Sequence, residues 1–367
     1  MHLGIDASRA VTTQRTGTEG YAYHLLKTLV PLAQEAGHQV TLYFNQTPPP
    51  GFLPEAAHEV IPFPRLWTHL RLGWALRRQR PDLFFTPAHV IPLSYFGPSV
   101  ATVHDLGYHY YPGAHTRFQV AYLNWSTLHN ARRSRRVLAD SRATRDDLVR
   151  IYHIPREKIA VVYPGVDPEL GPVRDPETLV SVLARYTIAG PYMLYLGTIQ
   201  PRKNLVRLIA AYGASHVEES LVLAGKAGWL SQPVLEAIAQ LPLEVQARIR
   251  ITGFVDEADK AALFSGATAL LYPSPYEGFG FPVLEAQACG TPVLCADSSS
   301  LPEVAGEGAL LVNAADSEAI RAGIQRLSRD RALRDQLVEA GFQNVRRFSW
   351  QQAAREVLAV LEEAARR

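Results

Sequence analysis

Short apolar runs alternate with stretches of helical periodicity along the chain, and this alternation limits the possible folds more than any other feature. Strands that alternate with helices build a parallel sheet with helices on its faces, so the pattern predicts an α/β fold with two doubly wound sheets. The predicted strands are residues 3–7, 40–44, 83–86, 99–103, 137–139 and 159–162 in the first half, and 192–197, 221–224, 248–251, 269–272, 293–295 and 309–312 in the second. Predicted helices include 21–32, 119–133, 144–152, 256–265 and 317–327.

Length and a proline- and glycine-rich stretch divide the chain into two domains. At 367 residues it is long enough for two α/β domains, each with its own core. Residues 164–176 mix proline, glycine and charges, and this composition is typical of a linker. We expect a first domain over 1–168, a second over 177–349, and a last helix over 350–367.

The composition excludes several classes of protein. The formal net charge of +2 is nearly balanced, so no nucleic acid partner is implied. Two cysteines, Cys289 and Cys295, lie in apolar surroundings, which argues against a disulfide scaffold or a thiolate metal site. No stretch of 18 apolar residues occurs, and residues 1–6 run directly into a strand without a signal sequence. We expect a soluble, cytoplasmic protein and leave open a peripheral position on the inner membrane face.

Two glutamates flank a glycine-rich turn between a predicted strand and a helix whose first turn carries Pro282. Glu277 is expected at the mouth of the sheet, and Glu285 about one turn into the helix. Gly278 and Gly280 let bare N–H groups approach an anion at the helix N-terminus. The segment suits a phosphorylated ligand whose hydroxyls are held by the carboxylates. Two exposed carboxylates at a helix end are the alternative.

Two adjacent cations, Arg202 and Lys203, follow another predicted strand within residues 197–204. Arginine offers a planar bidentate fork and lysine a mobile point charge, so together they suit a pyrophosphate. A solvated pair before a helix is the alternative.

The first half of the chain adds two candidates. Gly17 opens a predicted loop over 17–20 before the helix from Tyr21, and it permits either close approach to an anion or a plain helix entry. His104 follows the strand 99–103 and therefore lies at the end of the sheet where ligands bind.

The glutamate segment resembles the signature of the retaining nucleotide-sugar glycosyltransferases of family 4, in which a glutamate, seven residues and a second glutamate follow one another. The resemblance implies a B-type glycosyltransferase (GT-B) fold, with two Rossmann-like domains that face each other across a cleft. It implies that Glu277 contacts the donor sugar and that Glu285 accepts hydrogen bonds from the ribose. The loop amides of Gly278, Phe279 and Gly280 would approach the sugar and the phosphate.

The cation segment is similar to the family's Gly-x-x-x-Pro-Arg-Lys-Asn variant. This resemblance assigns Arg202 and Lys203 to the diphosphate, although Thr198 stands where many members have an arginine. Residues 252–256, which include Val255, look like the loop that frames the nucleobase, largely through its backbone.

The family also has a glycine loop that faces the diphosphate and often a histidine near the reacting centre. These features imply a diphosphate contact for Gly17 and a positioning role for His104. With Glu277, Arg202 and Lys203, His104 forms the expected catalytic set. No metal ligand is expected, because no Asp-x-Asp triad occurs in a suitable loop.

The resemblance implies a retaining, metal-independent hexosyltransferase without a cofactor. We expect mannose to move from GDP-mannose to a saccharide or lipid-linked glycan. A UDP-sugar transferase, a sugar-nucleotide epimerase and a non-catalytic nucleotide-sugar-binding subunit are the alternatives. In the family the terminal helix, here 350–367, packs back onto the first domain. The acceptor would bind near 45–95, where the resemblance is weak, so the identity of the acceptor stays open. The oligomeric state also stays open.

Two arginine-rich segments have no assigned role. Residues 65–78 combine apolar and cationic residues with Trp67 and Trp74, and such a helix can lie on an anionic membrane. We favour a core helix whose tryptophans pack inward and whose arginines are solvated. Residues 132–136 are likewise expected to form a solvated helix end, with acidic lipid or another polyanion as the alternative.

Overall fold

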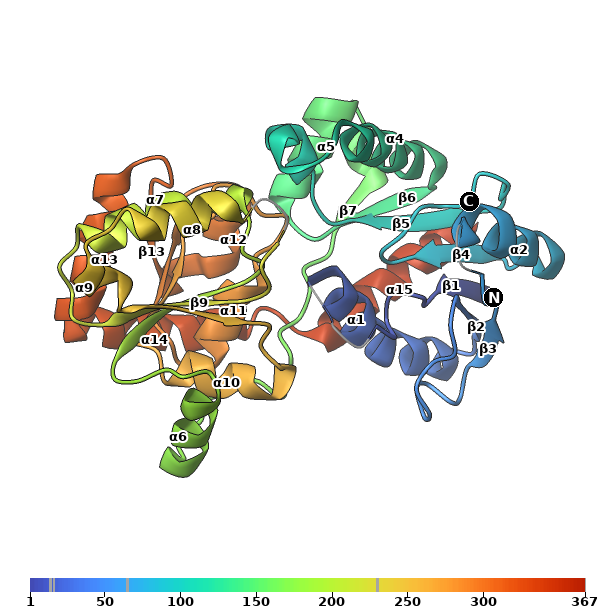
Figure 1. The fold of residues 1–367 in the computed structure, drawn as a ribbon. Coiled ribbons are helices and arrows are strands. Elements are labelled where there is room, and N and C mark those ends of the chain that lie inside the picture. The colour runs from blue at the N-terminus through green and yellow to red at the C-terminus, as the bar shows by residue number, and fades with distance from the viewer. Residues whose placement is uncertain (13–14, 16, 64–65, 229–230, 367) are drawn as a thin grey trace. The chain divides into compact units, whose positions relative to one another are not determined.

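The chain divides into two compact units, each with its own parallel sheet and core (Figure 1). The computed structural model describes residues 1–12, 15, 17–63, 66–228 and 231–366. Unit 1 comprises Met1–His109, Arg117–Gly165 and Phe348–Arg367, and unit 2 comprises Tyr110–Thr116 and Val166–Arg347. The expected α/β fold with two doubly wound sheets is confirmed.

The sheet of unit 1 has seven parallel strands in the order β3-β2-β1-β4-β5-β6-β7. Their bounds are β1 His2–Asp6, β2 Gln39–Phe44, β3 Ala57–Val60, β4 Leu83–Thr86, β5 Ser99–Val103, β6 Arg136–Ala139 and β7 Ile159–Val161. The chain adds β2 and β3 on one side of β1 and then continues with β4 on the other side. The strand order therefore reverses between β1 and β4.

The sheet of unit 2 repeats this topology with six parallel strands in the order β10-β9-β8-β11-β12-β13. Their bounds are β8 Tyr192–Leu196, β9 Ser220–Ala224, β10 Ile249–Gly253, β11 Ala269–Tyr272, β12 Val293–Ala296 and β13 Ala309–Val312. Here the order reverses between β8 and β11. In a doubly wound sheet, such a reversal is where ligands bind, beyond the carboxyl ends of the strands.

Helices cover both faces of each sheet, so the central strands are buried almost throughout and are mainly apolar. In the first half the helices are α1 Gly17–Glu35, η1 Thr68–Leu72, α2 Gly73–Gln79, α3 Gly107–Tyr110, η2 Pro112–Ala114, α4 Arg117–Arg133, α5 Arg142–Tyr152 and η3 Arg156–Lys158. In the second half they are α6 Pro176–Arg185, η4 Pro201–Lys203, α7 Leu205–Gly213, α8 Gln232–Ala239, α9 Leu243–Gln246, α10 Glu257–Ser265, α11 Phe281–Ala288, α12 Leu301–Ala305, η5 Gly306–Gly308, α13 Ser317–Arg329, α14 Arg331–Val345 and α15 Trp350–Arg366. Among the described residues, no helix has both the length and the apolar character needed to span a bilayer.

The C-terminal helix α15 belongs to unit 1, where it packs against α1 and the central strands. Trp350, Val357 and Leu361 are buried on its inner face. Arg136, at the start of β6, pairs with Glu363 at 2.9 Å. The last segment of the chain therefore completes the core of the first unit. Its expected last residue, Arg367, lies outside the described residues.

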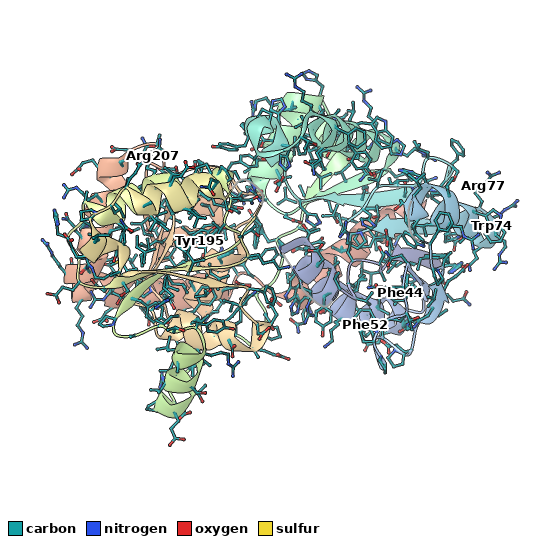
Figure 2. All side chains as sticks on the ribbon, in the orientation of Figure 1. Phe44, Phe52, Trp74, Arg77, Tyr195 and Arg207 are labelled. Carbon is teal, nitrogen blue, oxygen red and sulfur yellow. The ribbon has the colours of Figure 1, made fainter. Side chains whose placement is uncertain are left out.

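Large aromatic side chains are among the buried residues of both units, and Figure 2 labels Phe44, Phe52 and Tyr195. In unit 1, Phe44 is fully buried and its ring meets that of Phe52 at 6.2 Å. In unit 2, Tyr195 is fully buried and stacks on Tyr272, with ring centroids 5.9 Å apart. Tyr272 ends β11, so this stack connects the core to the carboxyl ends of the central strands.

The structure departs from the sequence-based expectation in two places in unit 1. Strand β3 was not predicted, because as an exposed edge strand it has no apolar run. Helix α1 begins at Gly17, four residues before the expected start at Tyr21, and continues through Pro31 to Glu35. The glycine segment 17–20 is therefore the first turn of a helix.

Candidate active site

The central strands of unit 2 bring two polar segments to one end of the sheet. β8 and β11 are neighbours, with Met193 opposite Ala269, and the strand order reverses between them. η4, which carries Arg202 and Lys203, follows β8, and the loop that carries Glu277 follows β11. Both segments therefore lie where a doubly wound sheet binds its ligand.

Glu277 is held by three side chains at this end of the sheet. Its Oε1 accepts hydrogen bonds from Lys203 Nζ at 2.5 Å and from the Tyr272 hydroxyl at 2.9 Å. Arg202 Nη1 lies 3.8 Å from Glu277 Oε2. Lys203 and Glu277 are only 6% and 7% exposed, so water competes little for these interactions. We call these four residues the Glu277 cluster.

The Glu277 cluster carries a net positive charge. Burial alone would raise the pKa of Glu277, but the attraction of Lys203 and Arg202 outweighs it and holds that pKa below its usual value. Burial and the charge of Glu277 raise the pKa of Tyr272, which stays a neutral hydroxyl. Two cations thus stand against one carboxylate, and the excess charge attracts an anionic ligand.

Serine side chains brace the loop of Glu277. The hydroxyls of Ser299 and Ser300 donate to the carbonyl oxygen of Glu277 at 2.6 and 2.9 Å, and Ser300 also lies 2.7 Å from that of Phe279. Both serines follow β12, the neighbour of β11. The loop is therefore held in place by contacts within its own unit.

The turn into α11 requires glycine. Gly280 has a φ of +110°, and a Cβ there would lie 2.5 Å from Leu301 Cδ2. Gly278 and Phe279 precede it, and the Phe279 ring packs edge-on against Phe281 at 5.1 Å. The Phe279 side chain thus belongs to the interior, and only its backbone is left for a ligand.

Glu285 meets a partner that the sequence did not suggest. Lys260 of α10 places its Nζ 3.5 Å from Glu285 Oε1 and 2.9 Å from Glu257 Oε2. Burial raises the pKa of Glu285, and although Lys260 opposes this shift, Glu257 adds to it. The ionised form of Glu285 is therefore less well satisfied than that of Glu277, and hydroxyl donors of a ligand would improve it.

Val255 lies in the loop between β10 and α10. Its side chain is only 5% exposed and belongs to the core of unit 2. A ligand could therefore contact the backbone of Val255 but not its side chain, as for Phe279.

A second polar cluster lies where the strand order of unit 1 reverses. Asp6 ends β1 and accepts hydrogen bonds from the Ser8 N–H at 3.0 Å and the Ser8 hydroxyl at 2.6 Å. His89, which follows β4, places Nδ1 3.0 Å from Asp6 Oδ2, and Arg9 Nε donates to His89 Nε2 at 2.6 Å. Arg9 also pairs with Glu19 at 3.2 Å. We call these five residues the Asp6 cluster.

His89 lies between a guanidinium and a carboxylate. An arginine N–H can only donate, so Nε2 of His89 accepts from Arg9, while Nδ1 faces Asp6. Attraction and hydrogen bonds from His89 and Ser8 outweigh burial and hold the pKa of Asp6 below its usual value. The Asp6 cluster therefore has two carboxylates against one permanent cation.

His104 is already paired within unit 1. Its Nδ1 lies 2.5 Å from Asp140 Oδ2, its Nε2 lies 2.8 Å from the carbonyl oxygen of Pro87, and its ring meets the edge of Tyr21 at 4.8 Å. Burial alone would lower the pKa of His104, but Asp140 outweighs it and raises the pKa. Both ring nitrogens thus face acceptors, which leaves no lone pair for a ligand in this arrangement.

Of the predicted residues, Arg202, Lys203 and Glu277 come together, and Gly278, Phe279 and Gly280 follow in the same loop. Glu285, Val255, Gly17 and His104 lie on other elements. Sequence reasoning missed Tyr272, Lys260 and the Asp6 cluster. A signal was present for the last, since Asp6, Ser8 and Arg9 are polar residues at the end of a predicted strand.

Comparison with known proteins agrees with this arrangement. Residues 15–170 match the family described as Glycosyltransferase Family 4, and residues 189–344 match Glycosyl transferases group 1. The O-antigen chain mannosyltransferase B of Escherichia coli is 31% identical over 299 residues, which are 80% of this chain and 77% of that protein. The chain belongs to the group 1, family 4 glycosyltransferases.

Solved structures resemble this glycosyltransferase over nearly its full length. A sucrose-phosphate synthase from Thermosynechococcus elongatus superposes with a TM-score of 0.77 at 20% identity, covering 99% of this chain and 98% of the other. HepE of Anabaena, in complex with UDP and glucose, superposes with a TM-score of 0.76 at 19% identity, covering 98% and 99%. At these identities the likeness shows the fold, which is GT-B.

Proposed function

We propose that this glycosyltransferase is a retaining mannosyltransferase that moves mannose from GDP-mannose to a saccharide or a lipid-linked glycan. The Glu277 cluster carries the proposal, because it places a net positive charge at the reversal of the unit 2 sheet. The choice of mannose follows the similarity to O-antigen chain mannosyltransferase B. A UDP-sugar is the second candidate donor, because HepE, which has the same fold, was solved with UDP and glucose.

In the proposed reaction Lys203 and Arg202 bind the donor diphosphate. As the bond between the sugar C1 and the diphosphate oxygen breaks, negative charge grows on the leaving group, and the two cations stabilise it. The acceptor hydroxyl oxygen forms its bond to C1 on the face that the diphosphate leaves, and its proton passes to the departing oxygen. Glu277, fixed by its cluster, orients the sugar hydroxyls.

The remaining contacts hold the donor. Glu285 accepts hydrogen bonds from the ribose. These bonds stabilise its ionised carboxylate, which burial disfavours. Backbone amides of Gly278 to Gly280 approach the sugar and phosphate at the start of α11, and the loop of Val255 frames the base. Gly17 contributes an N–H group of the first turn of α1 to the diphosphate.

His104 is proposed as a positioning residue. Its ring links the carbonyl of Pro87, beyond β4, to Asp140, beyond β6, and so fixes the carboxyl ends of three neighbouring strands. His104→Ala should therefore raise the KM for the acceptor more than it weakens nucleoside diphosphate binding, which steady-state kinetics and calorimetry can separate.

Independence from divalent metal is part of the proposal. Lys203 and Arg202 supply the positive charge that a metal ion would otherwise bring to the diphosphate. Turnover should persist in EDTA. A complete loss of activity that magnesium or manganese restores would refute this point.

A thermal-shift screen of nucleoside diphosphates tests the donor. A ligand at about 100 times its Kd stabilises the folded protein by about 2.7 kcal/mol, so the preferred base is readily distinguished. We expect GDP to raise the Tm most, and Lys203→Gln to reduce the shift to about half or less. Arg321→Gln, which alters an exposed helix pair of unit 2, is the matched control and should keep the shift. A larger shift with UDP would overturn the choice of GDP-mannose.

The product tests the reaction. An α-linked donor should give an α-linked product, which proton NMR of the anomeric centre resolves, and a β product would refute retention. Conversion of the donor sugar without transfer would indicate an epimerase. Absence of both transfer and donor hydrolysis would indicate a non-catalytic binding subunit.

A further inference from the structure

One region of unit 1 concentrates the positive charge of the chain. Between Glu59 and Asp140 the sequence contains ten arginines and only two acidic residues, Asp82 and Asp105. The formal net charge of the whole chain is only +2, so the rest of the chain is net acidic. The balanced total therefore conceals a strongly basic region.

Exposed apolar side chains lie among these arginines on η1 and α2. Leu70 is 54% exposed and Trp74 57%, and the Arg78 guanidinium lies over the Trp74 ring at 5.1 Å. Arg77 projects from the same short helix (Figure 2). Only Trp67, which is 6% exposed, packs inward.

The expectation that both tryptophans pack inward is therefore wrong for Trp74. Residues Thr68–Leu72 form a π-helix, whose wider turn breaks the α-helical register between Trp67 and Trp74. The two rings then no longer share a face, although they are seven residues apart. Arg65 of the same predicted segment lies outside the described residues.

Helix α4 presents a second stripe of the same chemistry. Phe118, Tyr122, Trp125, His129 and Arg133 follow one another at spacings of three or four residues and so share a face. Phe118 is 79% exposed, Tyr122 42% and Trp125 39%, while the Trp125 and His129 rings stack at 5.3 Å.

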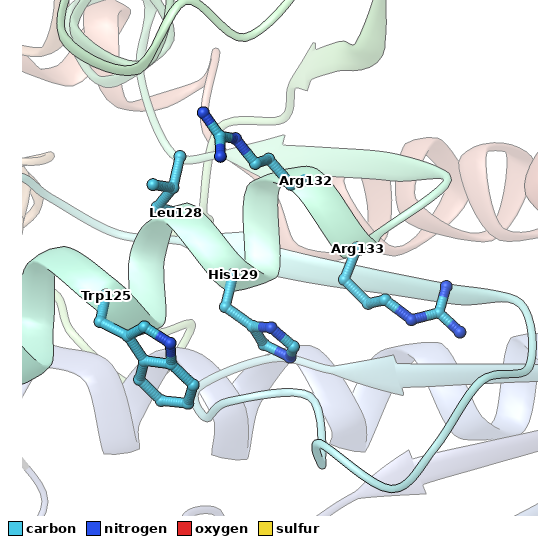
Figure 3. Close-up of a pocket in the computed structure, with 5 residues that line it drawn as sticks. All are labelled: Trp125, Leu128, His129, Arg132 and Arg133. Carbon is cyan, nitrogen blue, oxygen red and sulfur yellow. The ribbon is translucent and has the colours of Figure 1, made fainter.

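A hollow of about 380 Å³ lies along this stripe, lined by Trp125, Leu128, His129, Arg132 and Arg133. In Figure 3, Trp125, His129 and Arg133 project from one side of α4, and Leu128 and Arg132 project from the other. The hollow thus combines an aromatic wall with two guanidinium groups.

Contacts join the two stripes into one surface. The His69 ring of η1 meets the Trp125 ring at 6.0 Å. Arg133 donates to the carbonyl oxygen of Tyr95 at 3.3 Å and lies 5.7 Å from the ring of Phe96, which is 79% exposed. We call η1, α2, the loop 92–97 and α4 together the aromatic-arginine face.

We propose that the aromatic-arginine face docks the enzyme onto a membrane that contains anionic lipid. Tryptophan, tyrosine and phenylalanine favour the interface between headgroups and acyl chains, and arginines favour lipid phosphates. Charge complementarity selects this occupant. A neutral saccharide chain would use the aromatic rings but not the arginines, and a second copy of the chain would bring like charges together. The inference goes beyond the proposed reaction and suits a lipid-linked acceptor.

Vesicle co-sedimentation tests the proposal with the full chain. We expect binding to phosphatidylcholine vesicles that contain about 30 mol% phosphatidylglycerol, weak binding to phosphatidylcholine alone, and loss of binding at high salt. Each arginine near an anionic surface contributes about a fivefold factor, so Arg77→Gln/Arg78→Gln should weaken partitioning by about 25-fold and Arg133→Gln by about fivefold. Trp74→Ser should reduce the blue shift of tryptophan fluorescence on vesicle binding.

The matched control is Arg329→Gln/Arg331→Gln, which removes the same charge from exposed positions of unit 2 and should bind vesicles as the unaltered chain does. Equal loss in this control would show that only total charge matters and would overturn the proposal. Equal binding to pure phosphatidylcholine vesicles would also overturn the proposal. The same holds if anionic vesicles are not bound and the aromatic-arginine face instead binds mannan or mediates dimerisation of the chain. The Tm shift with GDP should persist in every variant, so failure of docking and failure of the proposed reaction are distinguishable.

Discussion

Two sheets of the same topology place different sets of charged side chains where their strand orders reverse. In unit 2, Arg202 and Lys203 surround Glu277, which leaves an excess of positive charge. In unit 1, the Asp6 cluster contains two carboxylates, Asp6 and Glu19, and one permanently charged cation, Arg9.

This difference shows that the shared topology supplies a position for a ligand and the side chains decide which ligand it suits. The positive cluster of unit 2 suits a diphosphate. The Asp6 cluster has no such excess of permanent positive charge, and its carboxylate, hydroxyl and guanidinium groups suit the hydroxyls of a neutral sugar. We therefore expect the donor to depend on the Glu277 cluster and the acceptor on the Asp6 cluster.

The largest expected effect is a loss of nucleoside diphosphate binding when a cation of the Glu277 cluster is removed. A charge-assisted hydrogen bond contributes about 1.5–3 kcal/mol, so Lys203→Ala or Arg202→Ala should weaken nucleoside diphosphate binding by about 10- to 100-fold. The same changes should lower kcat further, because charge on the leaving group grows in the transition state. Isothermal titration with nucleoside and nucleoside diphosphate, followed by steady-state kinetics, measures both effects.

Arg9→Ala is the matched change in unit 1. It should raise the KM for the acceptor and leave nucleoside diphosphate affinity unchanged. If it weakens nucleoside diphosphate binding as much as Lys203→Ala does, the assignment of donor and acceptor to different clusters fails.

The two glutamates of unit 2 should respond to neutral substitution with opposite effects on stability. Glu277→Gln leaves the buried Lys203 without its carboxylate and should cost about 3 kcal/mol of unfolding free energy. The raised pKa of Glu285 means that its ionised form is disfavoured in the folded protein, so Glu285→Gln should be neutral or slightly stabilising. Denaturant titrations measure both, and destabilisation of similar size in both variants would contradict this contrast.

A fall in pH should change the contributions of Glu277 and Glu285 to folding stability in opposite directions. The folded-state pKa of Glu277 lies below its unfolded value of about 4.3, so its stabilising contribution is present above that pH and is lost as the pH falls through the folded pKa. The folded-state pKa of Glu285 is raised, so its contribution is present at low pH and is lost as the pH rises through the folded pKa. Glu277→Gln should therefore flatten the loss of stability at acid pH. The measurement is the free energy of unfolding as a function of pH. If this dependence has the same shape for Glu277→Gln and the unaltered chain, Glu277 does not have the role given to it here.

The smallest expected effect concerns the serines that support each cluster. Ser300→Ala removes a buried hydroxyl that bonds the loop of Glu277 and should cost about 1 kcal/mol, with a several-fold rise in the donor KM. Ser8→Ala, which removes a donor to Asp6, should cost a similar amount but leave the donor KM unchanged. A rise in donor KM for Ser8→Ala would show that the two clusters serve one ligand.

The central strands were predictable because strands of a covered parallel sheet are buried on both faces and mainly apolar, as β4, β5 and β11 are. The edge strand β3 gave no such signal. The start of α1 at Gly17 was missed because glycine is a poor helix former, although a first helical turn tolerates it.

The site was only partly predictable for a related reason. Arg202, Lys203 and Glu277 were each recognisable after a strand, but their direct pairing depends on β8 and β11 being neighbours. Residues 203 and 277 are 74 positions apart, and strand order is not encoded locally. The pairing of Glu285 with Lys260 and of His89 with Asp6 likewise depends on tertiary packing.

The position of α15 has a consequence for biosynthesis. Unit 1 takes its core from the first 165 residues and from the last helix, which lies against α1 and the central strands. Unit 2 ends at Arg347. During translation, unit 2 can therefore acquire all of its residues while unit 1 still lacks a helix, although domains commonly fold in the order in which they are made. Helix α15 must emerge from the ribosome before the first unit to be synthesised can be completed.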